Sequence, residues 1–222
     1  MDEAELLGRY PRLYHMAHAD SWAGIKQRGL LSTTALLDLF EVQGADRQRI
    51  EATRRPDIIE LRHEQVGVAY VRDNKPLSDD RLRACLTDGL TPDDWYRELN
   101  RRVFFWPTER RLKTLLAARA YKQSAHVVLT VDTGKLVAIH RDEITLSAMN
   151  SGTTAPFAFP RGAATFQRIA DYDYSERKQK RGWRDAIAEI AVDYAVPDIV
   201  NMLEYAELHV PGSEPELLWQ RD

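Results

Sequence analysis

The sequence predicts an α+β fold in which one domain spans residues 1–222. Short β-branched and aromatic runs, each long enough for one strand, are interspersed with segments that begin with helix-capping residues. The chain contains no internal repeat, no low-complexity tract and no linker-like stretch that would divide it. With 222 residues the chain is long enough to enclose a sizeable hydrophobic core.

Composition narrows the class of protein further. Apolar residues make up 44% and charged residues 29% of the chain, which is typical of a folded domain rather than a disordered one. The single cysteine, Cys85, excludes an internal disulfide and a thiolate zinc cluster. No segment resembles a signal peptide or reaches membrane-spanning length, so we expect a cytoplasmic protein that does not bind a membrane. The oligomeric state is left open.

Capping and turn residues indicate the elements of the N-terminal half. Gly29 is expected to end the first helix in a left-handed turn, and Thr91 with Pro92 is expected to start a later one. Residues 43–57 are polar and basic, which is typical of a loop or a frayed helix. The expected strands are 13–16, 66–71 and 102–106, and the expected helices begin near residues 21, 33, 78, 91 and 108.

The C-terminal half reads mainly as strands. The run Val127 to Val131 is β-branched and continuous, as in a buried strand. Further short strands are expected at 136–139, 144–146 and 165–169, and the last core strand at 189–192. Residues 173–182 are polar and charged and predict a surface loop, while Pro197 is expected to start a closing helix.

Glu189 is the most informative single residue. It opens the apolar run Ile190, Ala191, Val192, and a carboxylate in such a run is costly to bury unless it is paired. Glu189 is therefore either the working group of a cleft or hydrogen-bonded scaffolding. The alternative is a glutamate at a strand edge that points to solvent.

Basic residues gather in one segment although the net charge is −3. Between Arg101 and Lys122, seven cations stand against Glu109 alone. Such a run attracts phosphate, either from a dinucleotide or from a nucleic-acid backbone. A solvated helix face explains the same run, so both interpretations stay open.

Several common catalytic signatures are absent. The chain has no Gly-rich phosphate loop, no pair of histidines at i, i+4 and no G-x-S-x-G elbow. His15 and His18 have no thiolate partner, and we expect no metal site.

The order of the blocks resembles the ADP-ribosyltransferase fold, and more closely the DarT-type ADP-ribosyltransferases. Leu13-Tyr14-His15-Met16 followed by a helix and Gly29-Leu30 looks like the opening of that fold. Arg72 ahead of Pro76, the aromatic strand 103–106, and Glu189 ahead of Val196-Pro197 are similar to further blocks. The chain as a whole also resembles an uncharacterised bacterial family of unknown function that shares these blocks.

The resemblance implies two small, mostly antiparallel sheets flanked by helices, with an NAD cleft between them. It implies NAD as substrate and Glu189 and Arg72 as catalytic residues, where Arg72 pairs with phosphate or fixes the acceptor. The residues implied to bind NAD are His15, Tyr14, Phe105, Trp106, Asn150 and Ser151. The expected nucleic-acid contacts are Arg110, Arg111 and Lys113.

Each of these residues also has a structural interpretation. His15 is equally a core histidine, Arg72 an ordinary turn cation, and Asn150-Ser151 a simple turn. Phe105 and Trp106 alternate across a strand, so at most one of them faces a given cleft and the other lies in the core.

The leading functional prediction is NAD-dependent ADP-ribosyl transfer, a glycosyltransferase reaction, with single-stranded nucleic acid as one expected acceptor. Two alternatives stay open. One is a catalytically inactive module of the same fold that binds a nucleotide or a protein. The other is an NAD glycohydrolase that uses water as the acceptor.

Overall fold

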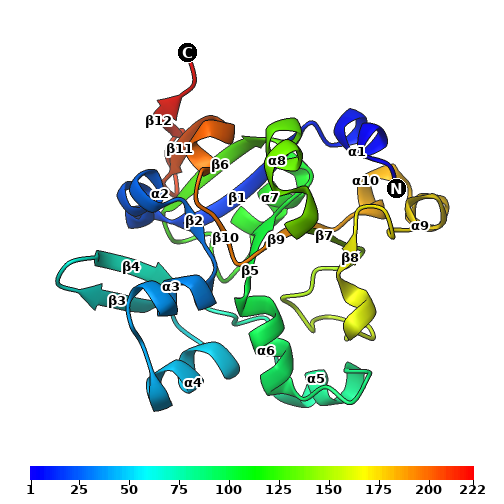
Figure 1. The fold of residues 1–222 in the computed structure, drawn as a ribbon, viewed down its shortest axis with the longest axis horizontal. Coiled ribbons are helices and arrows are strands. Elements are labelled where there is room, and N and C mark those ends of the chain that lie inside the picture. Colours follow the sequence, from blue (N-terminus) through cyan, green and yellow to red (C-terminus); the bar gives the residue numbers. More distant parts are fainter.

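The computed structural model describes residues 1–222 and consists of small antiparallel sheets with helices around them (Figure 1). The first four-stranded sheet has the order β1-β6-β11-β12, and all three of its pairings are antiparallel. Its strands are β1 (Arg12–His18), β6 (His126–Asp132), β11 (Leu203–His209) and β12 (Glu216–Gln220). The prediction of small, mostly antiparallel sheets is confirmed.

The second four-stranded sheet has the order β5-β9-β7-β8 and is also antiparallel throughout. Its strands are β5 (Arg102–Phe105), β9 (Glu189–Asp193), β7 (Ile144–Ser147) and β8 (Gln167–Arg168). Alternation along β9 puts Ile190 and Val192 in the main core, and Glu189 on the opposite face. The central position of β9 explains why even its polar first residue is buried.

The two sheets meet through their edge strands. The backbone N–H of Tyr14 donates to the Trp106 carbonyl at 3.0 Å, and the N–H of Trp106 donates back to the Tyr14 carbonyl at 2.8 Å. This single bridge joins β1 to the end of β5. On one side of the bridge β1 and β5 both line a large cleft.

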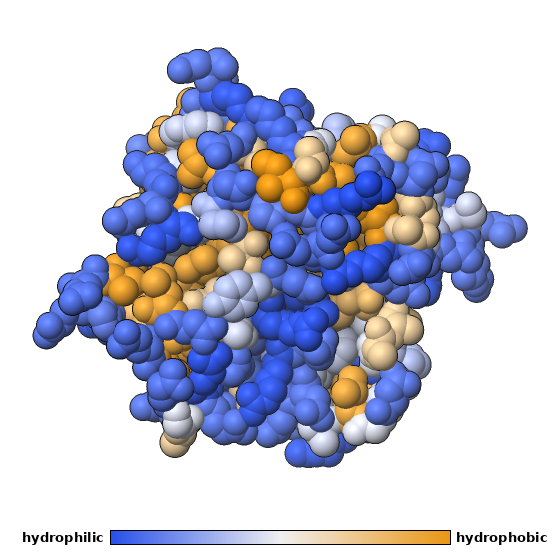
Figure 2. All heavy atoms as spheres, in the orientation of Figure 1, coloured by the Kyte–Doolittle hydropathy of each residue, from blue (hydrophilic) through white to orange (hydrophobic).

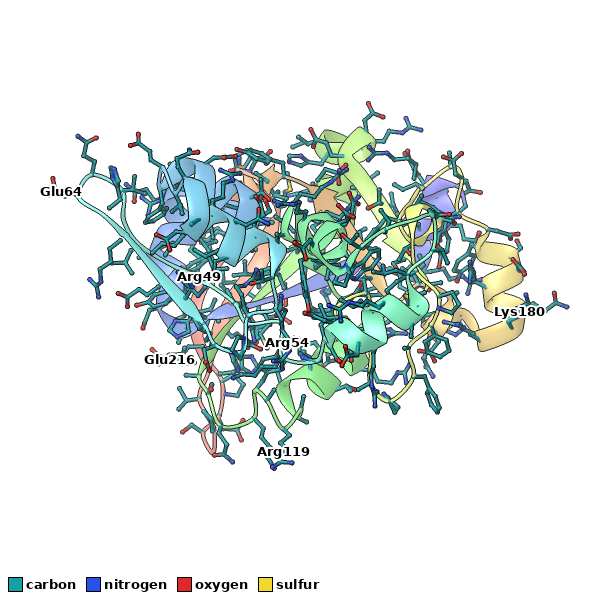
Figure 3. All side chains as sticks on the ribbon, turned by 90° about the horizontal axis from the view of Figure 1, so that it is seen from below. Arg49, Arg54, Glu64, Arg119, Lys180 and Glu216 are labelled. Atoms are coloured by element: carbon teal, nitrogen blue, oxygen red, sulfur yellow. The ribbon has the colours of Figure 1, made fainter.

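Two shorter strand pairs complete the walls of this cleft. β2 (Leu30–Leu31) pairs with β10 (Ala195–Val196), and β3 (Ile59–His63) pairs with β4 (Gly67–Val71) in a hairpin. The hairpin extends to the left in Figure 1, and Figure 3 shows Glu64 at its tip, pointing away from the body of the protein. In Figure 2 hydrophilic side chains dominate the visible face, with apolar ones gathered in patches, one of them over this hairpin.

The helices begin where capping residues predict. The Thr91 hydroxyl accepts from the Asp94 N–H, and the Asp94 carboxylate accepts from the Thr91 N–H, so the helix that starts at Pro92 has a full capping box. Ser32 and Thr108 cap two further helices through a single hydrogen bond each, their hydroxyls accepting from the backbone N–H three residues on. The helices are α1 (Glu3–Arg9), α2 (Trp22–Arg28), α3 (Thr33–Leu39), α4 (Gly44–Ala52), α5 (Asp79–Cys85), α6 (Pro92–Asn100), α7 (Glu109–Leu116), α8 (Thr133–His140), α9 (Tyr174–Arg181) and α10 (Trp183–Ala186). Short 3-10 turns lie at η1 (Ala19–Ser21), η2 (Arg141–Glu143), η3 (Ala163–Thr165) and η4 (Ile199–Met202).

Gly29 occupies a position that no other residue type fits. Its φ of +82° is in the region that favours glycine, and a Cβ there would lie 2.4 Å from the Pro197 Cα. This close approach lets β2 pair with β10 directly after α2 ends. The expected left-handed turn at Gly29 is therefore confirmed, with backbone packing as an additional cause.

Four expectations about elements are wrong. Residues 136–139 lie in α8 because Asp132 caps a helix there, its side chain accepting from the Lys135 N–H. Residues 173–182 contain α9, whose N-cap is Asp173. The expected strand at 165–169 is reduced to the two residues of β8. Pro197 leads into the short turn η4 and two strands, because β11 pairs with the central β6 and is covered by the edge strand β12.

The main core lies between the two sheets and α8, and contains Leu13, Phe105, Leu129 and Ile190 among its 28 buried residues. Smaller clusters lie under α3 and the β3–β4 hairpin, between α5 and α6, and under α7. No helix is long and apolar enough to cross a membrane.

His140 closes a buried ionic clamp at the end of α8. Its Nδ1 lies 2.6 Å from Glu143 Oε2 and its Nε2 lies 2.8 Å from Asp198 Oδ1. Burial alone would lower the pKa of His140, but the hydrogen bonds to these two carboxylates outweigh it and raise the pKa above 6.5. The clamp ties α8 to the segment that follows β10.

Candidate functional site

A cleft of about 660 Å³ opens between the edge strands β1 and β5. Its other walls come from the segment Ser21–Leu36, the strand β4 with the loop after it, helix α7 and the loop after β7. This volume lies within the range of small-molecule and cofactor sites. Glu189, His15 and Arg72, which are far apart in the sequence, all line it.

Glu189 lies at the start of β9 and is only 3% exposed. Its Oε2 accepts two hydrogen bonds from Ser151, one from the backbone N–H at 3.0 Å and one from the hydroxyl at 2.6 Å. Its Oε1 has no hydrogen-bond partner in the protein and is not fully enclosed. One carboxylate oxygen is thus anchored, and the other is available to a ligand in the cleft.

Burial raises the pKa of Glu189 from 4.5 to about 7. The hydrogen bonds from Ser151 and the charges of Arg111 and Arg161 lower the pKa, but they do not offset the loss of solvation. A carboxylate that titrates near neutral pH is suited to accept a proton during a reaction. The alternative of a strand-edge glutamate that points to solvent is wrong, because Glu189 is buried.

His15 projects from the middle of β1, and its Nδ1 lies 2.8 Å from the Phe104 carbonyl oxygen. Because a carbonyl only accepts, Nδ1 must carry the proton. Burial and the nearby Arg72 charge together lower the pKa of His15 to about 4, against the hydrogen bond to Phe104 that raises it, so the ring is neutral at pH 7. Its Nε2 is then an unprotonated acceptor with no partner in the protein.

Arg72 lies in the loop after β4, where it borders the cleft. One Nη donates to the Met16 carbonyl at 3.1 Å, and the guanidinium stacks over the Tyr121 ring at 4.6 Å from its centre. Burial lowers the pKa of Arg72. The charge of the neighbouring Asp73 acts on Arg72, but no salt bridge joins the guanidinium to a carboxylate.

The loop after β7 is a rigid anchor for Glu189. Asn150 Oδ1 accepts from the Gly152 N–H at 3.1 Å, and Arg161 donates to the carbonyls of Ser151 and Thr153 at 3.1 and 2.9 Å. Asn150 and Ser151 both border the cleft. They form the turn that their sequence predicts, but this turn also fixes the orientation of the Glu189 carboxylate.

The aromatic residues divide between cleft and core. Trp106 lines the cleft, as does Phe104, whereas Phe105 is fully buried in the main core and does not reach the cleft. The expectation that Phe105 contacts a ligand is wrong, because alternation along β5 turns it to the opposite face. Tyr14 does not line the cleft either, and it packs against the cluster under α7 that contains Met16 and Leu112.

The predicted basic run is largely neutralised. Arg110 and Arg111 both donate to Asp185 Oδ1, and Lys113 pairs with Glu109 at 2.6 Å along α7. Arg110 and Arg111 line the cleft, but Lys113 does not. The structure therefore separates Lys113 from the other two cations.

Sequence reasoning missed Arg161 and Asp185. Arg161 is 2% exposed and bonds backbone carbonyls, which no side-chain pattern in the sequence reveals. Asp185 lies four residues before Glu189 and meets α7 only in the folded chain. The one available signal was a run of basic residues with almost no acidic residues near it in the sequence, which indicates that its ion-pair partners come from another segment of the chain.

The chain belongs to a family of unknown function, DUF7002, whose model matches residues 11–203. No curated protein matches it. Among solved structures it is similar to Thermosipho africanus DarTG in complex with ADP-ribose, with 13% sequence identity and a TM-score of 0.44. That similarity covers 89% of this chain and 43% of the other, so this chain spans less than half of its neighbour's length.

Proposed function

We propose that this protein is an ADP-ribosyltransferase-like domain that cleaves NAD and transfers the ADP-ribose moiety, with Glu189 as the catalytic base. One observation carries the proposal. A recessed carboxylate with a pKa of about 7 presents a free oxygen to the same cleft as a neutral histidine that presents a free nitrogen. Both atoms are acceptors, so the ligand they recognise must donate hydrogen bonds.

A ribose diol supplies such donors. In the proposed reaction the bond between ribose C1′ and the nicotinamide nitrogen breaks, and its electron pair leaves with the nicotinamide. The ribose passes through an oxocarbenium-like state, which a nearby carboxylate stabilises. The acceptor then bonds to C1′ and gives its proton to Glu189, whose pKa of about 7 suits this step.

The other cleft residues have assigned roles in this proposal. His15 Nε2 accepts from a ribose hydroxyl, and Arg72 pairs with phosphate or fixes the acceptor. Trp106 gives the nicotinamide ring an apolar wall, and Asn150 offers its amide N–H₂ to the ligand. Ser151 positions Glu189 rather than binding NAD, since both of its donors are engaged by the carboxylate.

The acceptor is the second part of the proposal. Single-stranded nucleic acid is supported by Arg110 and Arg111 at the edge of the cleft. Their pairing with Asp185, and that of Lys113 with Glu109, leaves less free charge than the sequence alone indicates. With water as the acceptor, the same site acts as an NAD glycohydrolase.

Release of nicotinamide from NAD tests the chemistry. We expect Glu189→Gln to lower the rate at least a hundredfold, because positioned acid–base groups contribute about 10²–10⁴, while the Kd for NAD changes little. Glu216→Gln is the matched control, since Glu216 is exposed on β12 and points to solvent (Figure 3). Equal rates for wild type and Glu189→Gln would support a nucleotide- or protein-binding module instead.

A labelled-NAD assay identifies the acceptor. Label transferred to a single-stranded oligonucleotide supports a nucleic-acid acceptor, and free ADP-ribose as the sole product identifies the glycohydrolase. Binding of the oligonucleotide should weaken steeply with salt if its phosphates are contacted by arginines. Salt-independent binding would contradict the nucleic-acid acceptor.

A further inference from the structure

Two adjacent arginines at the edge of the cleft share one carboxylate oxygen. Arg111 Nη2 lies 2.9 Å from Asp185 Oδ1, and Arg110 Nη2 donates to the same atom. All three residues line the cleft together with Glu189. Two guanidinium groups thus share a single carboxylate at this point of the wall, and the Glu189 carboxylate acts on Arg111 only through its charge, with no hydrogen bond.

Arg111 also has an unused donor. Its Nε is enclosed by the protein and has no hydrogen-bond partner, although the side chain as a whole is 20% exposed. A buried N–H without an acceptor destabilises the free protein, and a ligand oxygen that reached it would remove this cost. The Asp185 carboxylate accepts only from Nη2 of Arg111 and leaves its Nε unpaired.

A phosphate group matches this set of donors better than a carboxylate does. Guanidinium groups bind phosphate in a bidentate manner, with two parallel N–H donors on two oxygens. A phosphate also has enough oxygens to serve two arginines at once, whereas here both converge on one oxygen of Asp185. Two adjacent guanidinium groups favour a ligand with more negative charge than a single carboxylate.

The position of Asp185 allows its carboxylate to separate from the two arginines. Its side chain is 40% exposed, and it lies in α10, a four-residue helical turn (Trp183–Ala186) that follows Gly182. Gly182 has a φ of +76° and nothing within 4 Å of where a Cβ would be. The backbone next to Asp185 is held, because Ala186 is fully buried in the main core, so only a rotation of the half-exposed Asp185 side chain is needed to release the arginines.

We propose that Arg110 and Arg111 form a phosphate-binding subsite of the cleft, which Asp185 occupies as a built-in competitor until a phosphate displaces it. The phosphate comes either from the diphosphate of a dinucleotide or from a polynucleotide backbone. The first source rests on the proposed function, but the subsite itself does not depend on NAD cleavage. Asp185 is thus a residue that tunes affinity.

Calorimetric titration of the free protein with inorganic pyrophosphate tests this proposal. Asp185→Asn keeps the size of the side chain and removes the competing charge, so pyrophosphate should bind about tenfold more tightly or better. Arg111→Gln should weaken binding about tenfold or more. Arg119→Gln is the matched control, because Arg119 follows α7, is exposed and does not line the cleft (Figure 3).

Two further ligands identify the source of the phosphate. Tighter binding of ADP-ribose to Asp185→Asn points to the diphosphate, and tighter binding of a short single-stranded oligonucleotide points to the backbone. Adenosine, which lacks phosphate, should bind the wild type and both variants equally. Asp185→Ser provides a second variant if Asp185→Asn does not fold, as judged by its circular dichroism.

Unchanged affinity of every phosphate ligand in folded Asp185→Asn and Asp185→Ser would overturn the proposal. The outcome is separate from that of the proposed function. A protein that gains pyrophosphate affinity in Asp185→Asn but never releases nicotinamide has the subsite and lacks the transferase activity. A protein that releases nicotinamide, but whose Asp185→Asn variant gains no affinity for pyrophosphate, cleaves NAD and lacks the subsite.

Discussion

Replacing Glu189 with glutamine tests whether the Glu189 carboxylate is desolvated in the ligand-free protein. Glutamine keeps the shape of the side chain and an oxygen that accepts from the Ser151 N–H and hydroxyl. It removes only the charge and the proton equilibrium. Any pH-dependent difference in unfolding free energy between the two proteins therefore reports the titration of Glu189.

The size and sign of the effect follow from the pKa. Burial raises the pKa of Glu189 from 4.5 to about 7, so the folded protein binds its proton more tightly than the unfolded chain. Below pH 4.5 the group is protonated in both states and costs nothing. As the pH rises towards 7 the wild type loses stability, by about 1 kcal/mol at pH 5 and about 3 kcal/mol at pH 8. Glu189→Gln has no such loss.

Urea denaturation at pH 5 and pH 8 measures the difference. Glu189→Gln should gain about 2 kcal/mol relative to the wild type between these two pH values. Glu216→Gln, an exposed substitution on β12, should show no such gain. If wild type and Glu189→Gln have parallel pH dependences, the carboxylate is solvated in solution, and its proposed role as a base poised near neutral pH fails. A gain together with lost nicotinamide release would show that the site sacrifices stability for activity.

Three further predictions concern other parts of the cleft and the fold. Ser151→Ala removes a hydrogen bond that lowers the pKa of Glu189, so the rising limb of the pH–rate profile for nicotinamide release should move to higher pH; an unmoved limb contradicts this. Gly29→Ala should destabilise the protein by about 2 kcal/mol or more, because its Cβ would lie 2.4 Å from the Pro197 Cα; chemical denaturation with an unchanged midpoint would refute it. His140→Ala should cost about 2 kcal/mol near pH 6. Because the raised pKa of His140 makes its stabilisation fade as pH rises through that pKa, the cost should be smaller at pH 9, and a cost independent of pH would show that the clamp is not ionic.

Local signals in the sequence predicted most of the strands and several helix starts. The β-branched run at Val127–Val131 became the central strand of the first sheet, and Thr91 with Pro92 started a helix with a full capping box. These elements depend on neighbours in sequence, where capping and alternation act. The C-terminal strands β11 and β12 were missed. β11 pairs with β6, which lies more than 70 residues earlier in the chain, and β12 is held only by its pairing with β11.

The sequence also singled out Glu189, since a carboxylate among apolar strand residues needs a reason wherever the strand lies. It could not decide between solvent and cleft. That decision came from the central position of β9 in its sheet and from Ser151, which reaches the carboxylate across 38 residues. The raised pKa is a property of this environment and not of the residue.

The sequence by itself determined the α+β class and the residue types that the cleft would draw on, and its resemblance to a known fold indicated antiparallel sheets. Only the tertiary structure decided which of them meet: it turned Phe105 and Tyr14 away from the cleft, gave Arg110 and Arg111 to Asp185, and anchored Glu189 to Ser151. The physical reason is that secondary structure follows from contacts within a few residues, whereas the facing of a side chain, its solvation and its ion pairs follow from segments that come together only on folding.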